Sequence, residues 1–181
     1  MTVMLRRSVD DARALGAAMA VGAGMGEAPA YRDALRQIGA YLAKRVVLDA
    51  ATQVVAVGRP GRRMAEGATT AWGPVDALGA TIAADGQLQV TWNRDRPRGD
   101  LPVAVLMPTI RSGLVLQLLL SDMARDGTAP VTVLAAQASG GAIDPLRRAH
   151  PYLEVITPEL VDLYPPGTSR PGWIRRDQPH Q

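Results

Sequence analysis

Apolar residues along this chain follow two patterns, one with helical spacing and one of short continuous runs. Tyr31, Leu35, Ile38 and Leu42 recur at helical spacing, which predicts a helix from Tyr31 to Arg45 with one face against a core. Four apolar runs bounded by turn-forming residues are typical of buried strands. These runs are Val54–Val57, Val103–Met107, Val131–Ala135 and Leu153–Ile156.

Helical segments lie between these runs. Met64–Thr70 and the almost wholly apolar Leu114–Met123 each follow a strand, and Asp144 with Pro145 predicts a helix start through an N-cap and a proline at the first helical position. The alternation predicts an α/β fold, with a mainly parallel sheet and helices on both faces. Strand-forming residues on either side of Asp85-Gly86 predict a small hairpin excursion.

The same patterns divide the chain into three segments. Residues 1–30 are predicted to form an N-terminal helix and a glycine-rich turn, and residues 31–162 the core. Residues 163–181 are rich in proline and glycine, which predicts either a C-terminal hood over the sheet edge or a tail. A length of 181 residues is that of one domain.

Composition narrows the classes of function. The chain has no cysteine, which excludes disulfides and thiolate metal sites, and we expect no metal and no cofactor. The net charge of +3 is small, and the arginines are scattered, so nucleic acid is not the expected partner. No apolar segment approaches the length of a membrane span or of a secretory signal, which predicts a cytoplasmic protein that does not contact membranes.

Ligands of parallel α/β sheets bind at the carboxyl ends of the strands, which directs attention to the loops after Val57, Met107, Ala136 and Ile156. Arg59, Arg62 and Arg63 follow the first strand, where they could bind an anionic group or form a solvated basic loop. Arg111 and Ser112 follow the second strand, as anion or oxyanion donors or as ordinary surface residues. His150 precedes a strand and is therefore expected at the opposite edge, interacting with a helix C-terminus.

Motifs in the same regions resemble those of uracil phosphoribosyltransferases. Arg59–Gly67 is similar to the family run R-A-G-L-G-M-V-D-G, with the arginine, first glycine, methionine and last glycine in common. Ala149–Pro151 matches a similar A-H-P, and the order of elements agrees over residues 31–162. The resemblance implies the type I phosphoribosyltransferase fold and a homodimer. It also places Glu66 at the family's aspartate, where it is either a general base or a surface carboxylate.

The loop that binds phosphoribosyl diphosphate (PRPP) in this family departs from the pattern. Where the family has D-P-M-L-A-T-G-G-S, this chain has the run Met107–Val115. The acid that would face the ribose hydroxyls is Met107, the second glycine is Leu114, and Arg111 lies within the loop. A thioether accepts hydrogen bonds only weakly, and Leu114 crowds a phosphate cradle. The family's base-recognition hood is not reproduced either, although Trp173 could stack on a ligand.

The resemblance and its departures together lead to a hypothesis. The chain is interpreted as a divergent family member that has lost PRPP and magnesium chemistry and serves another small molecule, plausibly in a biosynthetic cyclisation, isomerisation or related acid–base step. Two alternatives stay open: a non-catalytic dimeric subunit or ligand sensor, and a weak residual uracil phosphoribosyltransferase. The predicted catalytic residues are Arg59, Arg111, Ser112 and Glu66, and the predicted ligand-binding residues are Arg62, Arg63, Met107, Thr109, Gly113 and Trp173.

Overall fold

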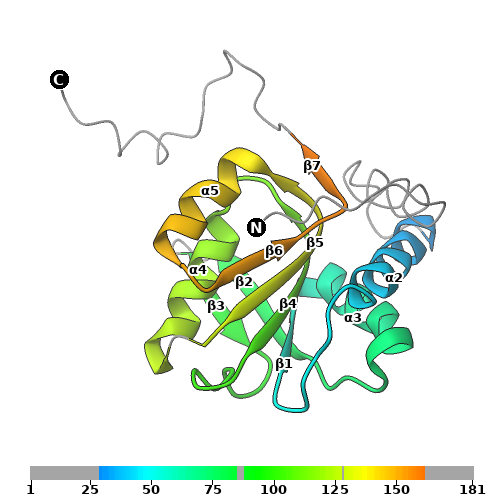
Figure 1. Cartoon of the computed structure of the whole chain (residues 1–181), viewed down its shortest axis with the longest axis horizontal. Helices are drawn as coiled ribbons and strands as arrows, with labels where there is room; N and C mark the ends of the chain where they lie inside the picture. The colour runs from blue at the N-terminus through cyan, green and yellow to red at the C-terminus, as the bar shows by residue number, and fades with distance from the viewer. Residues whose placement is uncertain (1–28, 85–87, 128, 162–181) are drawn as a thin grey trace.

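Strands and helices alternate along the chain as the apolar pattern predicts. The structure is a computed structural model, and it describes residues 29–84, 88–127 and 129–161. The predicted N-terminal helix with its glycine-rich turn falls almost wholly outside these residues, and residues 163–181, predicted as a C-terminal hood or tail, lie outside them. With the labels of Figure 1, the elements are α2 (Pro29–Ala43), β1 (Gln53–Val57), α3 (Gly58–Trp72), β2 (Leu78–Ala84), β3 (Leu88–Trp92), β4 (Val103–Ile110), α4 (Leu114–Met123), η1 (Ala124–Asp126), β5 (Val131–Ser139), α5 (Gly140–Ala149), β6 (Leu153–Ile156) and β7 (Glu159–Val161).

The strands form one mainly parallel sheet. Six of them follow the order β3-β2-β1-β4-β5-β6, and β7 pairs with β5 beyond the end of β6. Every pairing is parallel except that of β2 with β3. This antiparallel pair confirms the predicted hairpin, whose turn at residues 85–87 lies outside the described residues. Ala80 pairs with Val57 at the end of β1 and β2 continues to Ala84, so the hairpin extends beyond β1 at the carboxyl edge of the sheet.

Helices cover both faces of the sheet, which confirms the predicted α/β architecture (Figure 1). Alternate residues of each strand face opposite sides. In β4, Val105 and Met107 belong to the core cluster under α4 and α5, whereas Ala104 and Leu106 belong to the cluster under α2 and α3. A core on each face explains why these strands are apolar without interruption.

Glycines bring α2 and α3 into backbone contact with each other and bring α3 against the sheet. A Cβ atom at Gly39 would overlap the carbonyl oxygen of Met64, and one at Gly67 would overlap that of Arg36. At the start of α3, a Cβ atom at Gly61 would overlap the carbonyl oxygen of Leu106 in β4. Close packing of this kind requires the absence of a side chain.

The start of α5 corrects a prediction. The helix begins at Gly140, so Asp144 is not its N-cap and Pro145 lies inside it. Pro145 lacks the N–H that would reach the carbonyl of Gly141. The two glycines at the start are poor helix formers and look like a loop, but burial of Ala142, Ile143 and Leu146 against the sheet overrides that preference.

Indole hydrogen bonds fix two of the peripheral elements. Trp92 in β3 donates to the carboxylate of Asp122 in α4 over 2.8 Å, which ties the hairpin strand to the helix that covers it. Trp72 at the end of α3 donates to the carbonyls of Ala43 and Val46, over 2.9 and 3.0 Å, and so holds the chain that leaves α2. Both tryptophans have structural roles at the border of the core.

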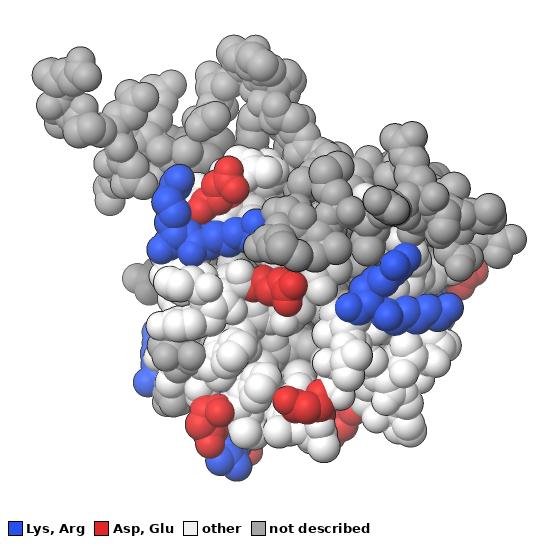
Figure 2. All heavy atoms as spheres, viewed as in Figure 1, with Lys and Arg blue, Asp and Glu red and all other residues white. Residues whose placement is uncertain are grey.

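The surface is mixed in charge. On the face shown in Figure 2, lysines and arginines gather in separate groups with acidic side chains between them and do not form one continuous belt across that face. Within the described ranges, no helix is both long enough and apolar enough to span a bilayer.

The contact between α2 and α3 predicts an asymmetry among glycines. Gly67→Ala should destabilise the fold by about 1–3 kcal/mol or more, because the new methyl group meets rigid backbone. The free energy of unfolding of Gly140→Ala should stay within about 1 kcal/mol of the wild-type value, since the new Cβ atom would meet nothing within 4 Å among the described atoms. Urea denaturation followed by circular dichroism compares the two variants, and equal midpoints would contradict the packing described.

Candidate functional site

Three helices begin at the carboxyl edge of the sheet. β1 runs directly into α3 and β5 directly into α5, while a short turn joins β4 to α4. Gly58 and Gly113 make two of these junctions with φ angles of 64° and 76°, in the left-handed region that favours glycine. Among the described residues, the N-cap residues of α3, α4 and α5 make no side-chain capping hydrogen bond, although the Ser112 hydroxyl accepts from the first N–H of α4. The three helix dipoles give this edge a partial positive charge.

A cavity of about 180 Å³ opens at the junction of β4 and α4. Its polar groups come from Thr109, Arg111 and Ser112, and its wall includes four apolar side chains. Met107 is only 3% exposed and belongs to the core under α4 and α5. The complete lining is Met107, Thr109, Ile110, Arg111, Ser112, Gly113, Val115 and Leu116. The structure thus brings together five of the residues predicted from the sequence.

Tyr31 adds a residue that the sequence analysis assigned only to the core. It lies in the first turn of α2, half-buried against the cluster beneath that helix. Burial raises the pKa of the Tyr31 hydroxyl, and the positive charge of Arg111 opposes part of that rise. The Tyr31 hydroxyl is thus within electrostatic range of the Arg111 guanidinium. Helical spacing alone cannot reveal this relation, because it depends on how α2 lies relative to β4.

The two hydroxyl residues of the loop have different surroundings. The Ser112 hydroxyl oxygen lies 3.4 Å from the backbone N–H of Leu114, which donates to it. Ser112 therefore satisfies a backbone group at the start of α4 and keeps its own proton available to donate. Thr109 is half-buried in β4, opposite Gln137 of β5. Both Thr109 and Ser112 are among the residues that line the cavity.

The three arginines after β1 were expected in a strand-end loop, and the structure places them elsewhere. They lie in the first turns of α3, not in a loop, because the helix starts at Gly58. Arg59 is exposed at the carboxyl edge. The guanidinium of Arg62 lies toward β2, 3.3 Å from where a Cβ atom of Gly79 would be. Arg63 turns instead toward Glu66.

Glu66 bridges α2 and α3. Its carboxylate accepts from Arg63 over 2.6 Å and from Arg36 over 3.0 Å. Burial acts to raise the pKa of this carboxyl group, but the hydrogen bonds from Arg63 and Arg36 outweigh it, and the pKa is lowered from its ordinary value. A carboxylate with a lowered pKa and two arginine partners is a weak base. Neither Glu66 nor Arg63 lines the cavity.

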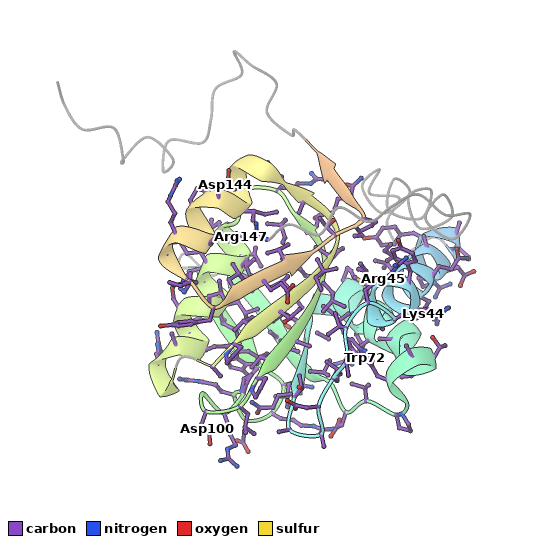
Figure 3. All side chains as sticks on the ribbon, in the orientation of Figure 1. Lys44, Arg45, Trp72, Asp100, Asp144 and Arg147 are labelled. Atoms are coloured by element: carbon purple, nitrogen blue, oxygen red, sulfur yellow. The ribbon has the colours of Figure 1, made fainter. Side chains whose placement is uncertain are left out.

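The remaining candidates lie elsewhere. His150 ends α5 by donating its backbone N–H to the carbonyl of Leu146, at the opposite edge of the sheet as predicted. There it borders a small hollow of about 40 Å³ with Val103 and Leu153, near the starts of β4 and β6. Asp100 marks this edge in Figure 3. Trp173 lies outside the described residues.

The donor set of the cavity does not fit PRPP with magnesium. A ribose diol and a hard cation both require oxygen ligands, above all carboxylates. No aspartate or glutamate is among the lining residues, and the position before Pro108 is the buried thioether of Met107. The described residues also contain no group of three or more potential metal ligands. We therefore derive no reaction step through this pair.

Comparisons with known proteins agree with this fold. No family model matches the sequence, and no curated protein matches it significantly. The chain is similar in structure to the AQ2163 protein from Aquifex aeolicus, with a TM-score of 0.69 and 16% identity over 88% of this chain and 87% of that one. It is also similar to Mycobacterium tuberculosis orotate phosphoribosyltransferase in complex with PRPP, with a TM-score of 0.57 and 13% identity over 86% and 96% of the two chains.

A third similar structure is a hypoxanthine-guanine phosphoribosyltransferase from Bacillus anthracis, with a TM-score of 0.51 and 15% identity over 74% of this chain and 81% of that one. At such identities the likeness shows the fold alone. The chain therefore has a phosphoribosyltransferase type I fold. The solved structures do not single out the uracil-specific family that the motifs resemble.

The ion pairs of Glu66 predict a pH-dependent contribution to stability. Because the folded-state pKa lies below the ordinary value of 4.5, the pairs stabilise the fold above about that pH and are lost as pH falls through the lowered pKa. Glu66→Gln should lower the free energy of unfolding by about 1 kcal/mol or less at pH 7, since these side chains are partly exposed. At low pH the substitution should have no effect, because Glu66 is then protonated and its ion pairs are already lost. The melting temperatures of the wild type and of Glu66→Gln, measured between pH 7 and pH 3, test this prediction. A difference between the two melting temperatures that widened on acidification would contradict it.

Proposed function

We propose that this chain uses the phosphoribosyltransferase fold to bind a small molecule other than PRPP, in the cavity between β4 and α4. The observation that carries the proposal is the composition of the cavity. Apolar side chains of Met107, Ile110 and Leu116 form part of its wall, with Arg111 and Ser112 beside them. Such a cavity favours a ligand with an apolar part and an anionic or electron-rich oxygen.

Three positive contributions support an oxygen anion at this edge. Arg111 supplies a full charge within the cavity lining, and Arg59 supplies another from the first turn of α3. The N-terminus of α4 adds its dipole. The same groups would stabilise negative charge that develops during a reaction, with Ser112 donating its hydroxyl proton to the oxygen. A cyclisation or isomerisation through an enolate-like state is the class of reaction that uses such groups, and biosynthesis of a specialised metabolite is the setting we propose.

A second candidate is a non-catalytic ligand sensor or subunit. The lining residues include no carboxylate and no imidazole, so the cavity lacks the groups that most often transfer protons near neutral pH. An acid–base step would depend on Tyr31 beside Arg111, with its raised pKa. A sensor needs only the binding contacts. Binding without turnover of any bound molecule would favour this second candidate, and a homodimer is compatible with both.

Loss of PRPP chemistry gives a direct prediction. Isothermal titration of the full chain with PRPP and magnesium should show no heat of specific binding, with or without uracil, because the cavity has no carboxylate for the ribose or the cation. An active uracil phosphoribosyltransferase under the same conditions is the positive control. Magnesium-dependent binding by this chain would instead support the residual phosphoribosyltransferase activity and would overturn the proposal.

Arg111 should control the binding of apolar anions. Phenyl phosphate and benzoate are suitable probes, since each combines one ring with one anionic group. Arg111→Met should weaken the binding of either probe about tenfold, as expected for the loss of one charge-assisted hydrogen bond. Methionine keeps much of the apolar stem of the arginine side chain. Arg148→Met is the matched control, because Arg148 is exposed near the end of α5. Equal affinities for the two variants in a titration would contradict the role given to Arg111.

A further inference from the structure

The size of the cavity at the β4–α4 junction limits what it can hold. Its volume is about 180 Å³. An apolar cavity of about 150 Å³ binds one benzene ring in another protein, whereas pockets for drug-sized ligands usually measure about 300 Å³ or more. Met107, Ile110 and Leu116 form part of the wall and are buried in the core, which fixes the shape of that wall. The enclosed part of a ligand is therefore about one six-membered ring.

Thr109 brings a hydroxyl group to this cavity. It lies in β4, is half-buried, and belongs to the lining. Within the described ranges, its hydroxyl makes no hydrogen bond with another protein group. No side-chain oxygen or nitrogen of the described residues is both buried and without a partner. The hydroxyl oxygen of Thr109 is therefore accessible, and it can donate to or accept from a bound molecule.

Packing alone does not require threonine at this position. Valine has nearly the same shape, also favours strands, and carries a methyl group in place of the hydroxyl. A hydroxyl among the buried side chains of Met107 and Ile110 loses part of its hydration, which is unfavourable unless another hydrogen-bond partner replaces the water. A ligand oxygen at this position would account for the polar group, which the core does not.

Thr109 and Arg111 lie at a separation that one ring can bridge. Ile110, between them, is the last residue of β4 and has an extended backbone, so the Cα atoms of Thr109 and Arg111 are about 6–7 Å apart. Alternate residues of an extended chain face the same side, and both residues line the cavity. A six-membered ring with substituents on opposite carbons can therefore place an anionic group at Arg111 and a second oxygen at Thr109.

We propose that Thr109 forms a hydrogen bond with a second, neutral oxygen on the ring of the ligand, a hydroxyl or a carbonyl group. The inference rests on the proposed function, because Arg111 binds the anionic group of the same molecule. It narrows the class of ligand to monocyclic acids that carry a hydroxyl or carbonyl group opposite the acidic group. Thr109 is then a specificity residue, which favours rings with this oxygen over rings without it.

The test compares benzoate with 4-hydroxybenzoate, which differ only in the ring hydroxyl, by isothermal titration of the full chain. In the wild type, the ring hydroxyl should strengthen binding several-fold to about tenfold, as expected for one hydrogen bond. Thr109→Val removes the protein hydroxyl with little change of shape. This variant should lose the gain while its affinity for benzoate stays that of the wild type. Thr109→Ser keeps a hydroxyl and should retain most of the gain.

Thr132→Val is the matched control. Thr132 is half-buried in β5 near the opposite edge of the sheet, where it pairs with Ala104, so this variant should show the wild-type gain. A ring hydroxyl that gives no gain in the wild type, or an equal gain in the wild type and in Thr109→Val, would overturn the inference.

Arg111→Met separates this inference from the proposed function. Binding of both acids that depends on Arg111, without a gain that depends on Thr109, would leave the proposed function standing and remove the role of Thr109. A gain that depends on Thr109, in acids whose affinity does not depend on Arg111, would keep Thr109 as a ligand contact and overturn the anion site of the proposed function. Failure of the wild type to bind either acid would overturn both.

Discussion

The close contact of α3 with its surroundings is the constraint on which the site depends. Gly61 places the start of α3 against the carbonyl of Leu106 in β4, and Gly39 and Gly67 let α2 and α3 meet backbone to backbone. Because α3 lies this close, β1 leads into it without a loop, and Arg59 stands at the carboxyl edge. The position of α2 in turn brings Tyr31 within electrostatic range of Arg111. Side chains at any of these glycines would move both helices away from the edge.

The turn between β4 and α4 combines a glycine-based helix start with an apolar lining. Gly113 retains the left-handed conformation that starts α4, so backbone donors still face the edge. Met107 and Leu116, however, join the core beneath the helix instead of presenting oxygen ligands. The lining therefore offers no carboxylate for a ribose diol or a hydrated cation, whereas Arg111 offers a positive charge to an anion. This composition is the basis of the proposal that the cavity binds an anion attached to an apolar body.

Much of the architecture could be predicted from the sequence, because continuous apolar runs and helical spacing directly report burial. The strands from Val103 and Val131 were predicted at the right places, although both extend further than their apolar runs, since Thr109 and Gln137 continue the ladder. The start of α5 was missed because local preference at Gly140 and Gly141 was overridden by packing. Side-chain partners were the least predictable: nothing in a linear pattern reveals that Glu66 joins Arg36, thirty residues away.

The same limit applies to the candidate site. Residues within one segment, such as Arg111 and Ser112, could be grouped from the sequence because their proximity is guaranteed by the chain. Tyr31 could not, because its relevance depends on which elements become neighbours in space.

The central claim is that the β4–α4 cavity binds an apolar anion. A crystal structure of the full chain grown with phenyl phosphate and magnesium tests it most directly. The account predicts the ring beside Met107 and Leu116, and the phosphate within hydrogen-bond distance of Arg111, without a coordinated cation. A cavity left empty at a saturating concentration, or a phosphate held through magnesium by carboxylates elsewhere on the chain, would contradict it.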